Sequence, residues 1–61
     1  MNIIFRENWR RGTVDVFEDG RLVYSNRDYS TTATWAQKTY NLTDQQLMEI
    51  YRDYKEDYDS I

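Results

Sequence analysis

The stretch "TVDVFEDGRLVYS", residues 13–25, decides the fold because it contains two strand-like segments joined by a single turn. Both segments are rich in β-branched and aromatic residues, which favour extended structure. The Asp19-Gly20 pair between them is a strong hairpin signal, because both residue types tolerate the left-handed backbone of a tight turn. The centre of the chain is therefore predicted to be an antiparallel hairpin.

Two lengths of this turn predict two different registers. A two-residue type I′ turn at Asp19-Gly20 would pair Phe17 with Leu22. A three-residue loop over residues 18–20 would instead gather four apolar side chains on one face of the hairpin: Val14, Val16, Leu22 and Tyr24. Because the buried face sets the register, we expect the three-residue loop.

A third strand is predicted ahead of the hairpin, in "NIIFRENW", residues 2–9. A two-residue loop at Arg11-Gly12 would set Trp9 opposite Val14, where it would anchor the core. Arginine is unfavourable at positive φ, so a longer loop or a bulge is the alternative. The first 26 residues predict a three-stranded antiparallel β-meander, with strands over about residues 2–10, 13–17 and 21–26.

The residues that follow the predicted sheet have the periodicity of a helix. Four residues share one helical face: Thr32, Trp35, Ala36 and Thr39. Asp28 or Ser30 can cap the start of this helix, and Asn41 can end it in the left-handed conformation. A helix is therefore predicted over about residues 31–40.

A second helix is predicted over about residues 44–59, because two independent signatures mark its start. Thr43 and Gln46 form a capping box, and Leu42 and Leu47 have the spacing of a hydrophobic staple. Six side chains of this helix are expected to face the sheet: Leu47, Ile50, Tyr51, Tyr54, Tyr58 and Ile61. The sequence thus predicts an α+β fold, βββαα, with both helices on one sheet face and a single domain over residues 1–61.

Composition restricts the chemistry available to the chain. Its 61 residues include eleven acidic and eight basic side chains, for a net charge of −3, and contain neither cysteine nor histidine. Disulfides, thiolate metal sites and histidine-activated nucleophiles are excluded. We expect no enzymatic activity, no cofactor and no bound metal.

The start of the chain bears on its location. The sequence begins with a methionine, has no signal-peptide pattern and has no apolar run of membrane-spanning length. We therefore expect a complete, soluble, cytoplasmic gene product, located in the host cytoplasm if a phage encodes it.

An acidic ridge on the second helix is the first candidate binding surface. It comprises Glu49, Asp53, Glu56 and Asp57. A row of carboxylates can imitate the phosphates of DNA and occupy a basic groove. The alternative is an ordinary solvated helix face, because Arg52 lies one turn from both Glu49 and Glu56 and partly neutralises them.

The sheet face away from the helices is the second candidate surface. The preferred register places Phe17 there between Arg6 and Arg21, with Arg10 nearby. An exposed aromatic side chain flanked by arginines is typical of a protein-interface hot spot. It could also stack a nucleic-acid base, although an acidic domain would be repelled by nucleic acid. The structural alternative is that arginine stems simply cover one surface phenylalanine.

These features together predict a small non-catalytic binding protein. Proteins of this size and composition are common among phage and mobile-element inhibitors of host enzymes. The expected partner is a host protein or nucleoprotein complex, such as a nuclease, a polymerase or a CRISPR-type defence complex. It would be blocked by steric occupation or by partial nucleic-acid mimicry. Two alternatives remain open, a nucleic-acid-binding regulator that uses the arginine-rich sheet face and a structural subunit that forms a homodimer.

Overall fold

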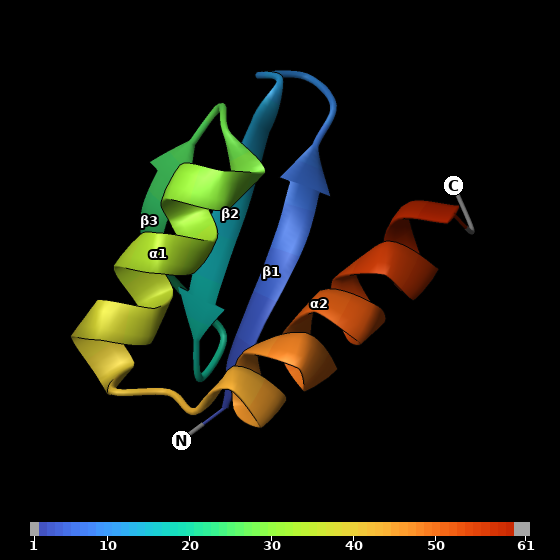
Figure 1. Cartoon of the computed structure of the whole chain (residues 1–61). Coiled ribbons are helices and arrows are strands. Elements are labelled where there is room, and N and C mark those ends of the chain that lie inside the picture. Colours follow the sequence, from blue (N-terminus) through green and yellow to red (C-terminus); the bar gives the residue numbers. More distant parts are fainter. Residues whose placement is uncertain (1, 60–61) are drawn as a thin grey trace.

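The chain folds as a three-stranded sheet followed by two helices (Figure 1). The computed structural model describes the backbone of residues 2–59 and the side chains of residues 2–56. The elements are β1 (Ile3–Asn8), β2 (Thr13–Glu18), β3 (Arg21–Asn26), α1 (Tyr29–Tyr40) and α2 (Asp44–Asp59). The βββαα prediction is confirmed, with strand β1 shorter than expected and α1 starting two residues earlier.

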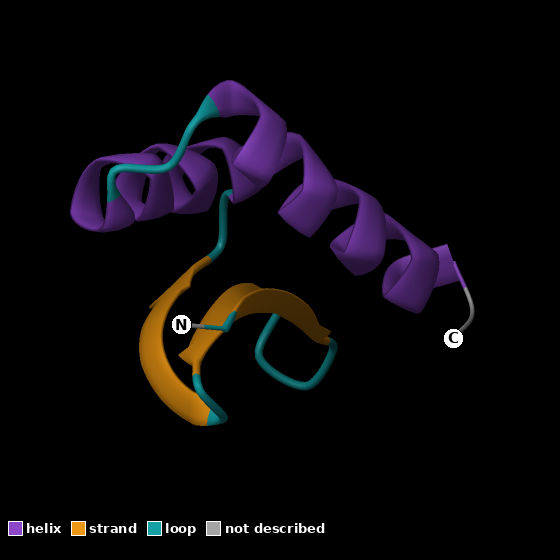
Figure 2. Ribbon diagram, turned by 90° about the horizontal axis from the view of Figure 1, so that it is seen from below, coloured by secondary structure: helices purple, strands orange, loops and turns teal. Residues whose placement is uncertain are grey.

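The strands pair antiparallel in the order β1-β2-β3, and both helices lie on the same side of the sheet (Figure 2). Helix α1 packs against β2 and β3, whereas α2 packs against β1. The buried apolar core lies between the sheet and the helices and consists of Phe5, Val14, Val16, Ala33 and Ala36. We call this side of the sheet the inner face and the opposite side the outer face.

The β2–β3 connection is a two-residue turn, so the predicted three-residue loop is wrong. Asp19 and Gly20 both have positive φ, 52° and 85°, and Glu18 pairs with Arg21 on either side of them. Asp19 tolerates this conformation better than most residues, and its carboxylate also accepts the backbone N–H of Asn2 at 2.8 Å. The tight turn that the Asp-Gly pair favours is therefore the one that forms.

A β-bulge reconciles this turn with a buried apolar face. Phe17 pairs with Leu22, but the next pair along the ladder is Val16 with Tyr24. Val23 is the extra residue, and it leaves Val16 and Tyr24 together on the inner face. The prediction failed because it assumed a regular ladder, in which only a longer loop could bring those two side chains together.

The β1–β2 connection is a four-residue loop over residues 9–12, not the expected two-residue turn. Asn8 pairs with Thr13, and the Gly12 N–H donates to the Asn8 carbonyl at 2.8 Å. Gly12 takes the positive φ, 69°, that would be unfavourable for arginine. The longer loop carries Trp9 out of the sheet, where it is 55% exposed, so its predicted place in the core is wrong.

Helix α1 begins and ends at residues suited to those positions. Asp28 is the N-cap, and its carboxylate accepts the Thr31 N–H at 3.1 Å. Hydrogen bonds from the Thr31 hydroxyl and backbone lower the pKa of the Asp28 carboxyl. Asn41 ends the helix with a φ of 54°, as predicted. The Trp35 ring stacks on Tyr24 with centroids 4.2 Å apart, which fixes α1 against β3.

The predicted capping box starts α2. The Thr43 hydroxyl accepts the Gln46 N–H at 3.1 Å, and the Gln46 side-chain oxygen accepts the Thr43 N–H at 2.8 Å. Leu47, Ile50 and Tyr54 pack against the core, as their spacing predicts.

The remaining residues of the predicted α2 stripe lie elsewhere. Tyr51 stands at the margin and is 43% exposed. The Tyr58 side chain and Ile61 lie outside the described part of the chain.

An aromatic cluster closes the space between the helices and β1. The Tyr29 ring lies 5.9 Å from Phe5, 5.2 Å from Tyr51 and 5.3 Å from Tyr54, measured between ring centroids. Burial, together with the neighbouring Tyr51, raises the pKa of Tyr29 to about 12. Because the rings contact one another at these distances, they serve to join the two helices to the sheet.

Candidate interaction surfaces

The outer face of the sheet is divided into a polar half and an apolar half. Pairing and alternation place two sets of side chains there. The polar set, toward the 9–12 loop, is Asn8, Thr13, Asp15 and Ser25. The apolar set, toward the β2–β3 turn, is Ile4, Phe17 and Leu22, one residue from each strand. We call these three residues the outer apolar row.

The polar half is a closed hydrogen-bond cluster around Asp15. One carboxylate oxygen accepts the hydroxyls of Thr13 at 2.8 Å and Ser25 at 2.5 Å. The other oxygen accepts the Asn8 side-chain amide at 3.2 Å. Asp15 is only 6% exposed, so these donors replace the water that the carboxylate loses. Asp15 is therefore a structural residue of the outer face.

The charge of Asp15 is retained despite its burial. Burial alone would raise its pKa, but hydrogen bonds from Ser25, Thr13 and Asn8 and the positive charge of Arg11 together lower it. Arg11 belongs to the 9–12 loop, which curls to the side of the sheet away from the helices (Figure 2). The polar half is thus saturated by its own neighbours and leaves little for a partner to bind.

The outer apolar row offers the opposite chemistry. Phe17 pairs directly with Ile4 on one side and with Leu22 on the other. Leu22 is 47% exposed, and the other two side chains are partly exposed. Their strand neighbours Phe5 and Val16 point to the inner face and form the core. The row therefore places three contiguous apolar side chains on the sheet face away from both helices.

Of the two arginines predicted to flank Phe17, Arg6 lies beside it on the outer face and Arg21 does not. Arg6 lies on the outer face, opposite Asp15 and next to the row. Arg21 pairs with Glu18, whose carboxylate accepts the Tyr40 hydroxyl of α1 at 2.7 Å, so both lie on the inner side. The two-residue turn changes the face of Arg21 relative to the expected register. Arg10 is exposed in the 9–12 loop.

Sequence reasoning missed Ile4 and Leu22 as members of this surface. Ile4 and Arg6 are two residues apart in β1, so the two-residue periodicity of a strand places both on the outer face. That periodicity was the signal by which Ile4 could have been found. Leu22 was expected on the inner face, because the bulge that turns it outward leaves no mark in the residue pattern. Phe17 itself lies on the outer face, where it was predicted.

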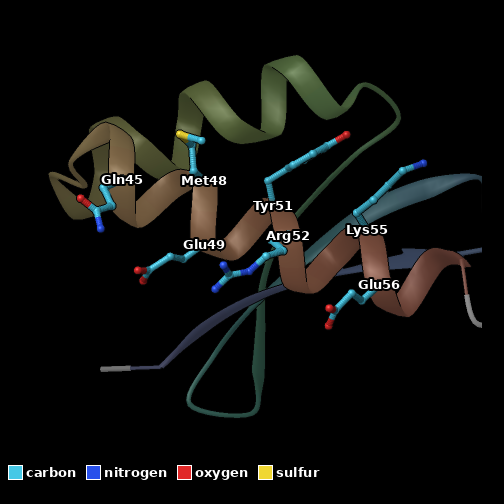
Figure 3. Close-up of a pocket in the computed structure, with 7 residues that line it drawn as sticks. All are labelled: Gln45, Met48, Glu49, Tyr51, Arg52, Lys55 and Glu56. Atoms are coloured by element: carbon cyan, nitrogen blue, oxygen red, sulfur yellow. The ribbon is translucent and has the colours of Figure 1, made fainter.

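The predicted acidic ridge is present on α2 as far as the structure describes it. Glu49, Asp53 and Glu56 are all exposed. Arg52 lies on the same side and extends along the helix toward Glu49, between two of the acids (Figure 3). The side chain of Asp57 lies beyond the described side chains. Arg52 interrupts the negative charge of the ridge, as the sequence suggested.

The same helix carries a shallow hollow of about 630 Å³ on its outward side (Figure 3). All the described residues that line it belong to α2, so no second element encloses it. Met48 is 69% exposed and is its main apolar side chain. An open helix surface of this kind does not shield a ligand from water, which a small-molecule site requires.

The described part of the chain has neither an acidic metal site nor a membrane-spanning helix. Among the side chains that the structure describes, those of residues 2–56, no group of three or more acidic residues is placed to hold a metal ion. Neither of the two described helices has both the length and the apolar character that crossing a bilayer requires.

Comparison with known proteins gave no relative: no family model matches the chain, and no curated protein or solved structure is significantly similar to it. The surfaces described above are therefore the only basis for assigning a function.

Proposed function

We propose that this chain is a non-catalytic binding domain that occupies the surface of a partner protein through its outer apolar row. The observation that carries the proposal is the alignment of Ile4, Phe17 and Leu22 across all three strands, on the face away from both helices. A contiguous apolar patch with a polar border commonly marks a protein-binding site.

The chemistry of the row and its border favours a protein partner. Fully burying a side chain such as Leu22 or Phe17 contributes about 1.5–3 kcal/mol, so even partial burial of three gives a useful driving force. Arg6 at the border adds a charged donor of the type that is enriched in interface hot spots. The hydrogen-bonded Asp15 cluster forms the polar border of the row on the side toward the 9–12 loop.

A nucleic-acid partner is less well supported. The arginines do not form one basic surface, because Arg6 lies on the outer face, Arg21 on the inner side and Arg10 in the 9–12 loop. The net charge of −3 would also repel a polyanion. We therefore propose steric occupation of a host protein or nucleoprotein complex, in the manner of small phage or mobile-element inhibitors.

A pair of matched variants tests the proposal. Phe17→Ser combined with Leu22→Ser removes two of the three apolar side chains of the row, and Met48→Ser removes an exposed apolar side chain of α2 outside the row as a control. Wild type and Met48→Ser are expected to capture the same partner proteins from lysate of the native or host cells, as identified by mass spectrometry. The double variant is expected to lose them while retaining its far-ultraviolet circular dichroism.

Three results would overturn the proposal. The first is that the double variant captures the same proteins as the wild type. The second is that the wild type captures none at about micromolar concentration, where an interface worth about 8 kcal/mol would be populated. The third is a salt-sensitive shift of labelled DNA or RNA, which would identify a nucleic-acid partner instead.

A further inference from the structure

Strand β1 has one edge paired with β2 and one edge that no strand of residues 2–59 covers. The Asn2 carbonyl accepts the Asp19 N–H and the Asn8 carbonyl accepts the Gly12 N–H, both at 2.8 Å. Even-numbered residues therefore direct their backbone groups toward β2. Alternation turns the N–H and C=O groups of Ile3, Phe5 and Glu7 toward the open edge.

A groove runs along this edge, with α2 as its second wall. One hollow of about 180 Å³ is lined by residues 3–6 of β1 and by Ile50 and Asp53 of α2. A second hollow of about 260 Å³ shares Ile3, Ile50 and Asp53 with the first and continues toward Glu49. Because the two hollows share three lining residues, they form one continuous surface, which we call the β1–α2 groove.

The groove has an apolar floor and predominantly acidic walls. Ile3 and Ile50 contribute apolar surface, while Glu49 and Asp53 place two exposed carboxylates on the helical wall. Arg6 is the cationic residue among those that line the two hollows. The walls therefore carry a net negative charge that attracts a cationic ligand.

We propose that the β1–α2 groove binds an extended, lysine- or arginine-containing segment of a partner protein, which adds to the sheet as a fourth strand beside β1. The segment's backbone pairs with the outward groups of Ile3, Phe5 and Glu7, which accounts for affinity. Its alternate side chains enter the groove, where its cationic groups meet Glu49 and Asp53. This site lies at the edge of the sheet and shares Ile4 with the outer apolar row, but neither Phe17 nor Leu22 lines it.

Charge favours this occupant over a second copy of the chain. A two-fold pairing of β1 with β1 would bring the α2 walls of both copies to one interface, with Glu49 and Asp53 from each. Like charges placed together at an interface cost free energy, and a basic segment avoids that cost.

The test uses two labelled octapeptides, one of alternating lysine and valine and one of alternating glutamate and valine. Fluorescence anisotropy with the wild-type chain is expected to show binding of the lysine peptide that weakens with added salt. Asp53→Lys is expected to weaken that binding by about tenfold, because it reverses a charge in the groove. Glu56→Lys reverses an exposed charge on the same helix outside the two hollows and serves as the matched control.

Hydrogen exchange gives the second measurement. The amides of Ile3, Phe5 and Glu7 are expected to gain protection when the lysine peptide is bound. Equal binding of the glutamate peptide, equal effects of Asp53→Lys and Glu56→Lys, or absent protection of these amides would overturn the proposal. The proposal would also be overturned if sedimentation showed that the chain alone self-associates and hydrogen exchange showed the same amides protected in that associated state. That result would assign the edge to a second copy. Each of these results is independent of the partner-capture result for the Phe17→Ser and Leu22→Ser double variant, so the two proposals can fail separately.

Discussion

The hydroxyl of Tyr54 on α2 donates a 2.8 Å hydrogen bond to the carboxylate of Glu7 on β1. A second bond of the same kind joins α1 to β2, where Tyr40 donates to Glu18 at 2.7 Å. Each helix is thus linked to a different strand by a tyrosine and a glutamate. The hydrogen bond to Glu18 also raises the pKa of Tyr40.

Removing either hydroxyl should destabilise the domain to a similar extent. Tyr54→Phe and Tyr40→Phe each remove one partly buried bond to a carboxylate, so each should lower the free energy of unfolding by about 1–2 kcal/mol. The two bonds share no partner, and the effects should add in the double variant. Urea denaturation measures all three values. A departure from additivity of more than about 0.5 kcal/mol would show that the helices are coupled.

Asp15 should be among the polar residues least tolerant of substitution. Asp15→Ala leaves the side-chain donors of Thr13, Ser25 and Asn8 without their shared acceptor in a buried position. We expect a loss of about 1–3 kcal/mol in the free energy of unfolding. Asp53→Ala removes an exposed carboxylate and should change it by less than about 0.5 kcal/mol. Equal effects of the two substitutions in urea denaturation would contradict a structural role for Asp15.

The lowered pKa of Asp15 also predicts how stability depends on pH. Because its folded pKa lies below the ordinary value of 3.8, its contribution is fully present above that value. The contribution is lost as the pH falls through the folded pKa, where the carboxylate is protonated. Asp15→Asn should therefore lose less stability than wild type between about pH 5 and pH 2. Thermal unfolding across this range measures the difference, and parallel curves would refute the prediction.

The capping box of α2 gives a prediction confined to one helix end. Thr43→Ala removes the acceptor of the Gln46 N–H and should cost about 1 kcal/mol. Thr43→Ser keeps the hydroxyl and should cost much less. Because the change lies at the start of α2, hydrogen exchange should increase first in that helix. An equal increase in β2 would instead indicate that the domain opens only as a whole.

Sequence reasoning predicted the order of elements and most helix boundaries because those depend on local signals. The capping box at Thr43 and the left-handed stop at Asn41 act within one turn of helix, and both were recognised from residue type alone. The change from a period of two to helical spacing separated the sheet from α1. These signals need no knowledge of which strands pair.

The pairing of strands could not be predicted in the same way. Trp9 was expected in the core and Arg21 on the outer face, because both placements assumed turns that preserve a regular ladder. The structure instead has a four-residue loop and a bulge, and these irregularities depend on how the whole sheet packs. The candidate surface changed accordingly, from a phenylalanine between two arginines to an apolar row with one arginine beside it.

The bulge has a consequence for the tolerance of this fold to changes in chain length. Within the ladder between β2 and β3, Val23 has no partner. Deleting it would bring Leu22 and Tyr24 into direct succession, with each side chain on the face that it already occupies. A variant that lacks Val23 would keep the other core residues and the outer apolar row in place, and it would lose only the apolar contact that Val23 makes with the core. Position 23 is where we expect insertions and deletions to accumulate as such a sheet diverges.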